Sequence, residues 1–361
     1  MTVEELHNNL HNLLPFKEDK GKPFQKRLNI CFDKYLGWVT NLQLAGTPLD
    51  METVESVTFI CNKIKEIVSN TLKGMPSTSF TQIHRLLNGF YGEQKKIDIQ
   101  ATLLILPPNK NFYRMRIMES IKDIDRSELF HIPIAQRGIV KTQRYSSPGY
   151  PCLYLGKSIY GCWEEMRRPP MHQCAVARFE NECELYFINL TIPSAKQLKE
   201  SSFLKLIPLV IACMIRVDEV NATFKPEYIV PQLLIEWILK NRKFKLEEEK
   251  KEIHGVAYLS THLNKDFEFP MSTFINYAIP VFSVNTNNKY CYKLCNTFSL
   301  TNPTTNDLEK LKGGYVIDGG GIGLPPEADL QQNYKTSDFG NLEERLKDET
   351  RFELGKINWK K

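Results

Sequence analysis

The residues with the clearest potential for chemistry are an arginine, a tyrosine and a glutamate, Arg144, Tyr154 and Glu165, spaced ten and eleven residues apart. A guanidinium group binds phosphate or carboxylate groups through forked hydrogen bonds. A tyrosine ring stacks on a flat ligand, and a half-buried carboxylate stabilises positive charge that develops in a reaction. Each residue alone is more often structural: a surface arginine, a core aromatic ring, or a carboxylate paired with a base such as Arg168. Their joint occurrence in one short segment favours a shared site.

A strand and a turn are expected to present the tyrosine. Pro148-Gly149 is typical of a turn. The apolar run that follows, Cys152 to Leu155, predicts a strand, in which side chains alternate between the two faces. Tyr154 would then face away from the leucines on either side of it.

A short helix is expected to present the glutamate. Ser158 can cap a helix that extends to Arg167, with Ile159, Cys162, Trp163 and Met166 on one apolar face. At about 100° per residue, Glu165 falls at the edge of this face, whereas Glu164 points nearly away from it. We therefore expect Glu165 to be half-buried beside Tyr154 and Glu164 to be solvated.

The stretch around these residues resembles the RES-domain family, which is named for an Arg, a Glu and a Ser. The pattern of this family has an Arg shortly before a Pro-Gly turn, a Tyr ending the next strand and a Glu on the next helix. Arg144, Tyr154 and Glu165 fit this pattern. An upstream Arg is matched by Arg114, and the segment ending at Ser260 resembles the one that carries the Ser. The resemblance covers roughly residues 105 to 285.

The resemblance implies an NAD-consuming enzyme. Glu165, Arg144 and Tyr154 would be catalytic, and four further residues would bind NAD: Arg114, Ser260, Tyr113 and Tyr258. NAD would be the substrate, with no separate cofactor and no metal. The carboxylate would stabilise the positive charge on the ribose as nicotinamide departs, the arginines would hold anionic oxygens, and Tyr154 would stack on nicotinamide.

Several functional alternatives stay open at this point. The family includes toxins of toxin–antitoxin pairs, so we favour NAD degradation by hydrolysis or phosphorolysis, with an inhibitory antitoxin protein as a partner. Transfer of ADP-ribose to a protein is the second hypothesis. The third is a module without activity that senses a nucleotide and binds a partner through its helices. A homo-oligomer is also open.

The distribution of apolar residues predicts an α+β fold with three consecutive regions: a helical region over 1–100, a catalytic domain over 101–300 and a polar extension over 301–361. The resemblance implies a mixed β-sheet similar to that of ADP-ribosyltransferases for the middle region. In the first region, apolar residues recur at helical spacing over 28–42, 54–68 after Asp50 as a cap, and 81–88. These stripes favour packing within the chain over a partner-binding surface.

Strands and helices alternate after residue 100. Strands are expected over 102–106, 112–116, 152–155, 185–190, 256–259 and 279–284, and helices over 158–167, 203–215 and 231–240. The mixed-charge run 240–252 is interpreted as a solvated helix end or loop. The glycine-rich run Gly313 to Gly323 resembles a dinucleotide fingerprint, but Leu324 stands where the third glycine belongs and Pro325-Pro326 blocks the helix. A flexible loop is the better interpretation.

The overall composition excludes several classes of protein. A net charge of +5 over 361 residues is mild for nucleic-acid binding. The nine cysteines are scattered and often lie in apolar runs, which is typical of reduced thiols. Cys291 and Cys295, even with His254 and His262, lack the usual spacing of a zinc site. The longest apolar stretch, 206–215, is too short to span a bilayer, and no secretory signal begins the sequence, so a cytoplasmic location without membrane or nucleic-acid partners is expected.

Overall fold

The computed structural model describes residues 1–18, 21–118, 124–246, 248–262, 269–282, 289–305 and 327–354. These residues form two compact units that interleave along the chain. Unit 1 comprises 1–104, 141–148 and 186–261, and unit 2 comprises 105–140, 149–185 and 262–361. These units do not follow the three consecutive regions expected from the sequence. The glycine-rich run 313–323 lies outside the described residues.

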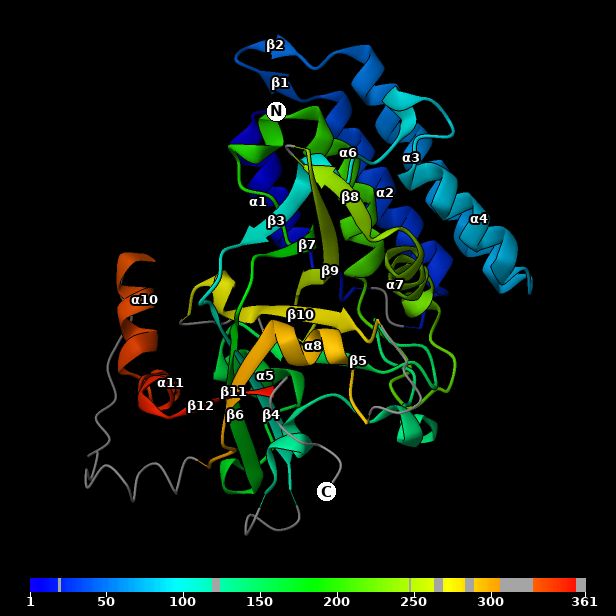
Figure 1. The fold of residues 1–361 in the computed structure, drawn as a ribbon. Coiled ribbons are helices and arrows are strands. Elements are labelled where there is room, and N and C mark those ends of the chain that lie inside the picture. Colours follow the sequence, from blue (N-terminus) through cyan, green and yellow to red (C-terminus); the bar gives the residue numbers. More distant parts are fainter. Residues whose placement is uncertain are drawn as a thin grey trace. The chain divides into compact units, whose positions relative to one another are not determined.

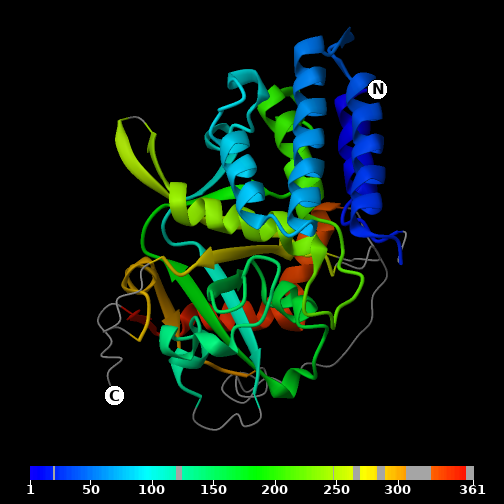
Figure 2. The ribbon, with the colours of Figure 1, turned by 90° about the vertical axis from the view of Figure 1, so that its right-hand side faces the viewer.

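Unit 1 is mainly helical. The helices α1 and α2 are followed by the longest helix, α3, which packs against α2, α4 and α6 (Figures 1 and 2). The helices of this unit are α1 (Val3–Leu13), α2 (Phe24–Thr40), α3 (Met51–Leu72), α4 (Pro76–Leu87), α6 (Ser201–Cys213) and α7 (Ile229–Asn241). Asp50 caps α3 as predicted, since its carboxylate accepts a hydrogen bond of 2.7 Å from the backbone N–H of Thr53. The predicted helical stripes are buried within the chain, as expected.

Unit 1 also contains strands. β7 (Leu185–Leu190) and β9 (Glu249–Leu259) are parallel neighbours, and β3 (Leu103–Leu106) follows β7 in strand order. β8 (Lys243–Leu246) pairs with β9 in an antiparallel hairpin. The interpretation of 240–252 as a helix end or loop is therefore wrong for most of its length. Phe244 of β8 is buried, at 9% exposure. The charged residues around it hide the alternation of apolar and polar residues by which a strand is predicted. A small hairpin, β1 (Gln43–Leu44) and β2 (Thr47–Pro48), joins α2 to α3.

Unit 2 is built on antiparallel strands in the order β12-β11-β6-β4-β5-β10. Their bounds are Arg351–Glu353 for β12, Phe298–Thr301 for β11, Cys174–Asn181 for β6, Asn111–Ile117 for β4, Cys152–Gly156 for β5 and Ile275–Pro280 for β10. The unit also contains four α-helices among its described residues: α5 (Ile159–Glu165), α8 (Tyr292–Thr297), α10 (Glu327–Thr336) and α11 (Asp338–Asp348). Parallel pairing in unit 1 and antiparallel pairing in unit 2, together with the helices, confirm the predicted α+β class.

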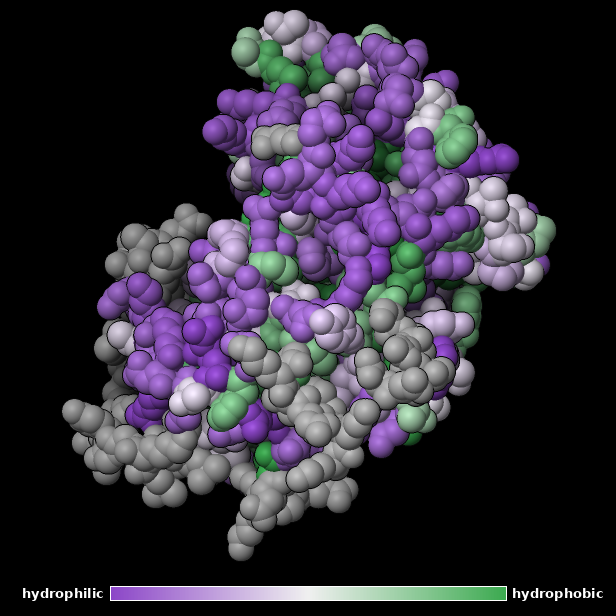
Figure 3. All heavy atoms as spheres, in the orientation of Figure 1, coloured by the Kyte–Doolittle hydropathy of each residue, from purple (hydrophilic) through white to green (hydrophobic). Residues whose placement is uncertain are grey.

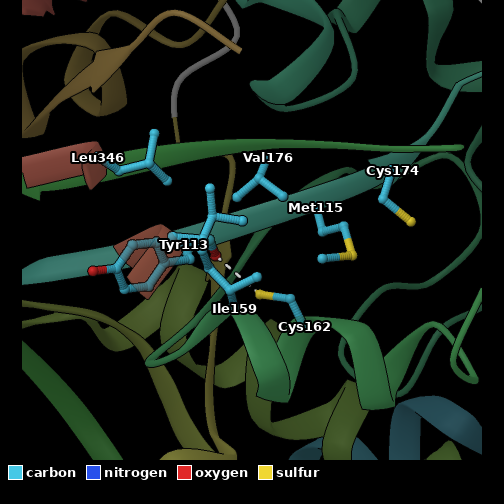
Figure 4. Close-up of a cluster of buried hydrophobic side chains, with 8 residues drawn as sticks. Tyr113, Met115, Ile159, Cys162, Cys174, Val176 and Leu346 are labelled. Carbon is cyan, nitrogen blue, oxygen red and sulfur yellow. Dashed lines mark hydrogen bonds between the residues drawn. The ribbon is translucent and has the colours of Figure 1, made fainter. Parts of the chain in front are cut away.

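An apolar cluster joins the strands of unit 2 to its helices. Tyr113, Met115 and Val176 from β4 and β6 contact Ile159 and Cys162 of α5, and Leu342 and Leu346 of α11 complete the cluster (Figure 4). The C-terminal residues, polar on average, therefore supply core side chains. On the face drawn in Figure 3, hydrophilic residues dominate the described surface and apolar ones are scattered, as in ordinary water-soluble surfaces.

Candidate functional site

Glu165 ends helix α5 and is half-buried, as the sequence predicts. Its side chain is 28% exposed, and Oε1 accepts a hydrogen bond of 2.8 Å from the side-chain amide of Asn276 on β10. Its other oxygen, Oε2, lies 4.0 Å from Nε2 of His262. The carboxylate is thus held at one oxygen and has a titratable neighbour at the other. This arrangement is suited to stabilising a positive charge next to it.

Glu164 differs from expectation. Its residue is 4% exposed, and its Oε1 accepts hydrogen bonds of 2.9 Å and 2.6 Å from Nε and Nη2 of Arg168. Its carboxylate also contacts the hydroxyl of Tyr160, whose pKa burial and this carboxylate raise. The prediction that Glu164 is solvated is therefore wrong. Arg168, named above as a base that would pair with a structural Glu165, pairs with Glu164 instead. A helical wheel shows only where side chains lie around the helix axis. It does not show that a seven-residue helix packed on more than one side has few fully exposed positions.

Helix α5 lies very close to the strands beneath it. Ser158 caps the helix as predicted, with its hydroxyl accepting a 2.9 Å hydrogen bond from Gly161 N and donating one of 2.7 Å to Thr273 O. A Cβ on Gly156 would lie 2.5 Å from Cys162 Sγ, and one on Gly161 would lie 2.7 Å from Thr273 O. Both glycines are therefore required by close approach, and α5 has little freedom to shift.

Tyr154 and Asn276 share one face of the β5–β10 pair. The register places Gly156 opposite Asn276 and Tyr154 opposite Ala278, and residues two apart on a strand point to the same side. Tyr154 is intermediate in exposure, while its neighbours Leu153 and Leu155 are buried. The predicted orientation of Tyr154, opposite to the adjacent leucines, agrees with this pattern.

Arg114 is a partly buried cation on β4. It interacts electrostatically with Tyr154, Cys162 and Arg116, and burial lowers its pKa to about 9, so the guanidinium stays protonated near neutral pH. Its Nη1 atom is buried and has no hydrogen-bond partner among the described residues. A buried N–H without a partner carries a free-energy cost of about 1–3 kcal/mol. Such a group is a natural donor for an anionic ligand.

His131 lies near this guanidinium and is neutral. Its Nδ1 donates to Ile132 O at 2.8 Å, and its Nε2 accepts from Cys291 N at 2.9 Å. Burial, together with the charge of Arg114, lowers the pKa of His131 to about 4, against the opposing effect of its hydrogen bond to Ile132. The neutral imidazole therefore neither balances the positive charge of Arg114 nor adds a second positive charge beside it.

Tyr113, predicted to bind NAD, is a member of the apolar cluster. It is 2% exposed, and its backbone oxygen accepts a 3.3 Å hydrogen bond from Cys162 Sγ (Figure 4). Burial raises the pKa of its phenol. The structure gives this side chain a packing role, and its predicted contact with NAD stays a prediction.

Arg144 lies in unit 1, where its donors meet protein oxygens. Nη1 donates to Cys213 O at 2.7 Å, Nη1 and Nη2 share Ile215 O at 3.3 Å, and Nη2 donates to Thr261 Oγ1 at 3.0 Å. The guanidinium also stacks over Tyr228 at 5.2 Å. The cation therefore sits on the carbonyl end of α6, where a helix dipole favours positive charge. A structural role for Arg144 is evident, whereas its predicted catalytic role has no direct support.

Tyr258 and Ser260 are also in unit 1. Tyr258 is 7% exposed, and its ring lies 4.6 Å from that of Tyr145, the neighbour of Arg144. Ser260 is fully buried next to Thr261, the residue that Arg144 contacts.

The seven predicted residues therefore divide between the two units. Unit 2 contains Glu165, Tyr154, Arg114 and Tyr113, and unit 1 contains Arg144, Tyr258 and Ser260. Within unit 2 the sequence reasoning missed Asn276, the partner of Glu165. A signal existed: an asparagine interrupts the apolar strand over 274–280, and a buried amide needs a partner.

Other kinds of site lack support in the part of the chain that is described. No three His, Cys, Asp or Glu side chains gather there as a metal site would require. All nine cysteines are reduced, and only Cys183 is exposed. No helix in the described ranges is long and apolar enough to cross a membrane.

The chain is similar to "Putative toxin YopC" of Bacillus subtilis (strain 168), with 30% identity over 276 residues. The match covers 70% of this chain and 60% of that protein, so the chain spans less than two thirds of its relative. No family model matches the sequence. No solved structure gives a significant match either, so the resemblance to ADP-ribosyltransferases stays a prediction.

Proposed function

We propose that this protein cleaves the bond between nicotinamide and ribose in NAD and acts as a toxin. The observation that carries the proposal is the half-buried carboxylate of Glu165, fixed by Asn276, in the same unit as the cation Arg114, whose buried Nη1 has no hydrogen-bond partner among the described residues. A dinucleotide offers both a ribose that becomes positive and an anionic pyrophosphate. The RES-domain resemblance of the surrounding sequence supports the same reading.

The proposed reaction needs no acid for the leaving group. The C1′–N1 bond breaks with its electron pair going to the cationic ring, which leaves as neutral nicotinamide. The ribose becomes an oxocarbenium-like cation, and water adds at C1′ and loses a proton, giving ADP-ribose. Glu165 would stabilise the cation electrostatically, and Asn276 would keep the carboxylate oriented.

Other side chains would bind the rest of the dinucleotide. Arg114 would donate Nη1 to a pyrophosphate or ribose oxygen, which would satisfy its buried N–H. Tyr154, on the same face as Asn276, would stack on nicotinamide. Arg144 retains the role implied by the resemblance only if its bonds to backbone oxygens are exchanged for ligand contacts, so Arg114 is our preferred anion-binding residue.

The toxin role draws on the name of the relative. That protein bears the name "Putative toxin YopC", and depletion of NAD is a direct way in which an enzyme of this kind would harm a cell. An inhibitory partner protein belongs to this proposal as well. Because the matched region covers 60% of the relative, the activity is proposed for this chain and not for the whole relative.

The test is the release of free nicotinamide from NAD by purified full-length protein. We expect release by the wild type, a loss of at least 100-fold with Glu165→Gln, and at least tenfold with Arg114→Gln, because each variant removes charge from a transition-state contact. The NAD is radiolabelled in its ADP-ribose part. Label recovered as free ADP-ribose would mean hydrolysis, and label bound to protein would mean ADP-ribosyl transfer. Absence of any release by the folded wild type would leave the module without activity as the better hypothesis.

The controls must be chosen from the structure. Glu164 is unsuitable, because it is buried and ion-paired with Arg168. Glu182→Gln changes an exposed carboxylate of the same unit, and Arg116→Gln changes the next residue but one on β4, whose ion pair with Glu128 is partly exposed. Both should retain nicotinamide release within about threefold of the wild type, because neither side chain is assigned a contact with NAD.

A further inference from the structure

Helix α5, which ends at Glu165, is too short to be stable alone. It has seven residues, whereas isolated helices below about 12–15 residues are marginal in water. The first N–H groups of any helix also lack partners within the helix. The placement of Glu165 therefore depends on groups outside α5 that satisfy its N-terminus and cover its sides.

A carboxylate from a distant part of the chain completes the cap of α5. Ser158 satisfies Gly161 N, and Oε1 of Glu343 on α11 accepts a 2.7 Å hydrogen bond from Ile159 N. The same Oε1 accepts a 2.5 Å bond from the hydroxyl of Tyr334 on α10. Two C-terminal helices thus hold the start of the helix that ends in Glu165.

Ring contacts attach α11 to α5. Phe339 of α11 lies 5.1 Å from the ring of Tyr160 and 5.4 Å from that of Trp163. Leu342 and Leu346 of α11 belong to the apolar cluster with Ile159 (Figure 4). The far end of α11 is held as well, since Nη2 of Arg178 donates to Lys347 O at 3.2 Å. The supporting helix is therefore fixed at both ends.

We infer that Glu343 is a positioning residue: its carboxylate, by capping α5 from α11, sets the place of Glu165 at the other end of that helix. The inference rests on the proposed function for the role of Glu165. A loss of the cap would let the first turn of α5 unwind, and Glu165 would lose its 2.8 Å contact with Asn276. This assigns a function to the polar C-terminal segment, for which the sequence offered none.

The test uses the full chain and compares Glu343→Ala with Glu343→Gln, which keeps an acceptor oxygen for Ile159 N. The neighbouring Glu344, 59% exposed, gives the matched control Glu344→Gln. Amide hydrogen exchange over 159–165 is measured first, because this readout needs no NAD. We expect exchange at least tenfold faster with Glu343→Ala, recovery to within threefold with Glu343→Gln, and no change with the control.

Nicotinamide release is the second readout and separates the two proposals. We expect Glu343→Ala to lower kcat at least tenfold with KM changed less than threefold, because α5 loses alignment and the residues assigned to anion binding stay intact. Faster exchange with an unchanged kcat would overturn the positioning role. Faster exchange with no release by the wild type would leave the cap intact and overturn the proposed function instead. If Glu343→Ala does not fold, Tyr334→Phe takes its place, because it removes one of the two hydrogen bonds to Oε1 of Glu343. This variant should show smaller changes in amide exchange and in kcat. Unchanged exchange in Tyr334→Phe would contradict the inference.

Discussion

The side-chain amide of Asn276 on β10 donates a 2.8 Å hydrogen bond to Oε1 of Glu165 at the end of α5. Two elements about 110 residues apart in the sequence thereby fix one carboxylate oxygen, while His262 lies 4.0 Å from the other. The bond links a rigid strand to a short helix, and it determines which way the carboxylate points.

Replacing Asn276 by alanine should therefore lower nicotinamide release about tenfold, because Glu165 keeps its charge but loses its orientation. Asn276→Asp should lower it further, since a second carboxylate would repel the first. The rates are compared at equal folded fraction, checked by circular dichroism. Rates for both variants within twofold of the wild type would show that this hydrogen bond does not matter to the reaction.

The ion pair of Glu164 and Arg168 is asymmetric in burial, with side chains 5% and 49% exposed. Removing Arg168 leaves a buried carboxylate without its cation, whereas removing Glu164 leaves an arginine that water can solvate. We expect Arg168→Ala to lower the free energy of unfolding by about 2 kcal/mol and Glu164→Gln by about 1 kcal/mol or less. Urea denaturation gives both values, and the reverse order would contradict the assigned burial.

The partly buried carboxyl of Glu343 should make stability depend on pH. Burial raises its pKa from the ordinary 4.5 to about 7, against the opposing effects of Tyr334, Lys347 and the N–H of Ile159, while Glu344 raises it. The phenol of Tyr113 and the thiol of Cys162 also interact with this carboxyl, which raises their own pKa values.

The sign of the effect follows from proton uptake. Between about pH 4.5 and 7 the folded chain holds a proton on Glu343 that the unfolded chain has released, so stability falls as pH rises through this window and is constant above it. The full difference would be roughly 3 kcal/mol, at about 1.4 kcal/mol per pKa unit. Glu343→Gln should flatten this part of the profile measured by urea denaturation, and Glu344→Gln should not. An identical slope in Glu343→Gln would rule out Glu343 as its source.

Gly156 should tolerate no side chain. An added Cβ would lie 2.5 Å from Cys162 Sγ and 3.0 Å from Ser158 O, so α5 would have to move off the strands. We expect Gly156→Ala to lower the free energy of unfolding by about 1–3 kcal/mol. Gly37→Ala is the contrasting case, because it lies within α2 with open space around it and should raise stability by about 0.5–1 kcal/mol. Equal melting temperatures for the two variants would contradict this difference.

The sequence by itself determined the local frame of the site. Ser158 as a cap, the strand that begins at Cys152 and the half-buried place of Glu165 all follow from short-range rules, because turns, caps and side-chain alternation depend on residues within one or two turns. The α+β class and the long helices of the first hundred residues were accessible for the same reason.

Only the tertiary structure decided which distant groups meet these elements. Glu164 is buried and ion-paired with Arg168, and Asn276 and Glu343 reach the helix from about 110 and 180 residues away. The guanidinium of Arg144 binds the carbonyls at the end of α6, a partnership that no spacing in the sequence encodes. Desolvation and hydrogen bonding depend on what surrounds a group in space, and that is set when the chain folds.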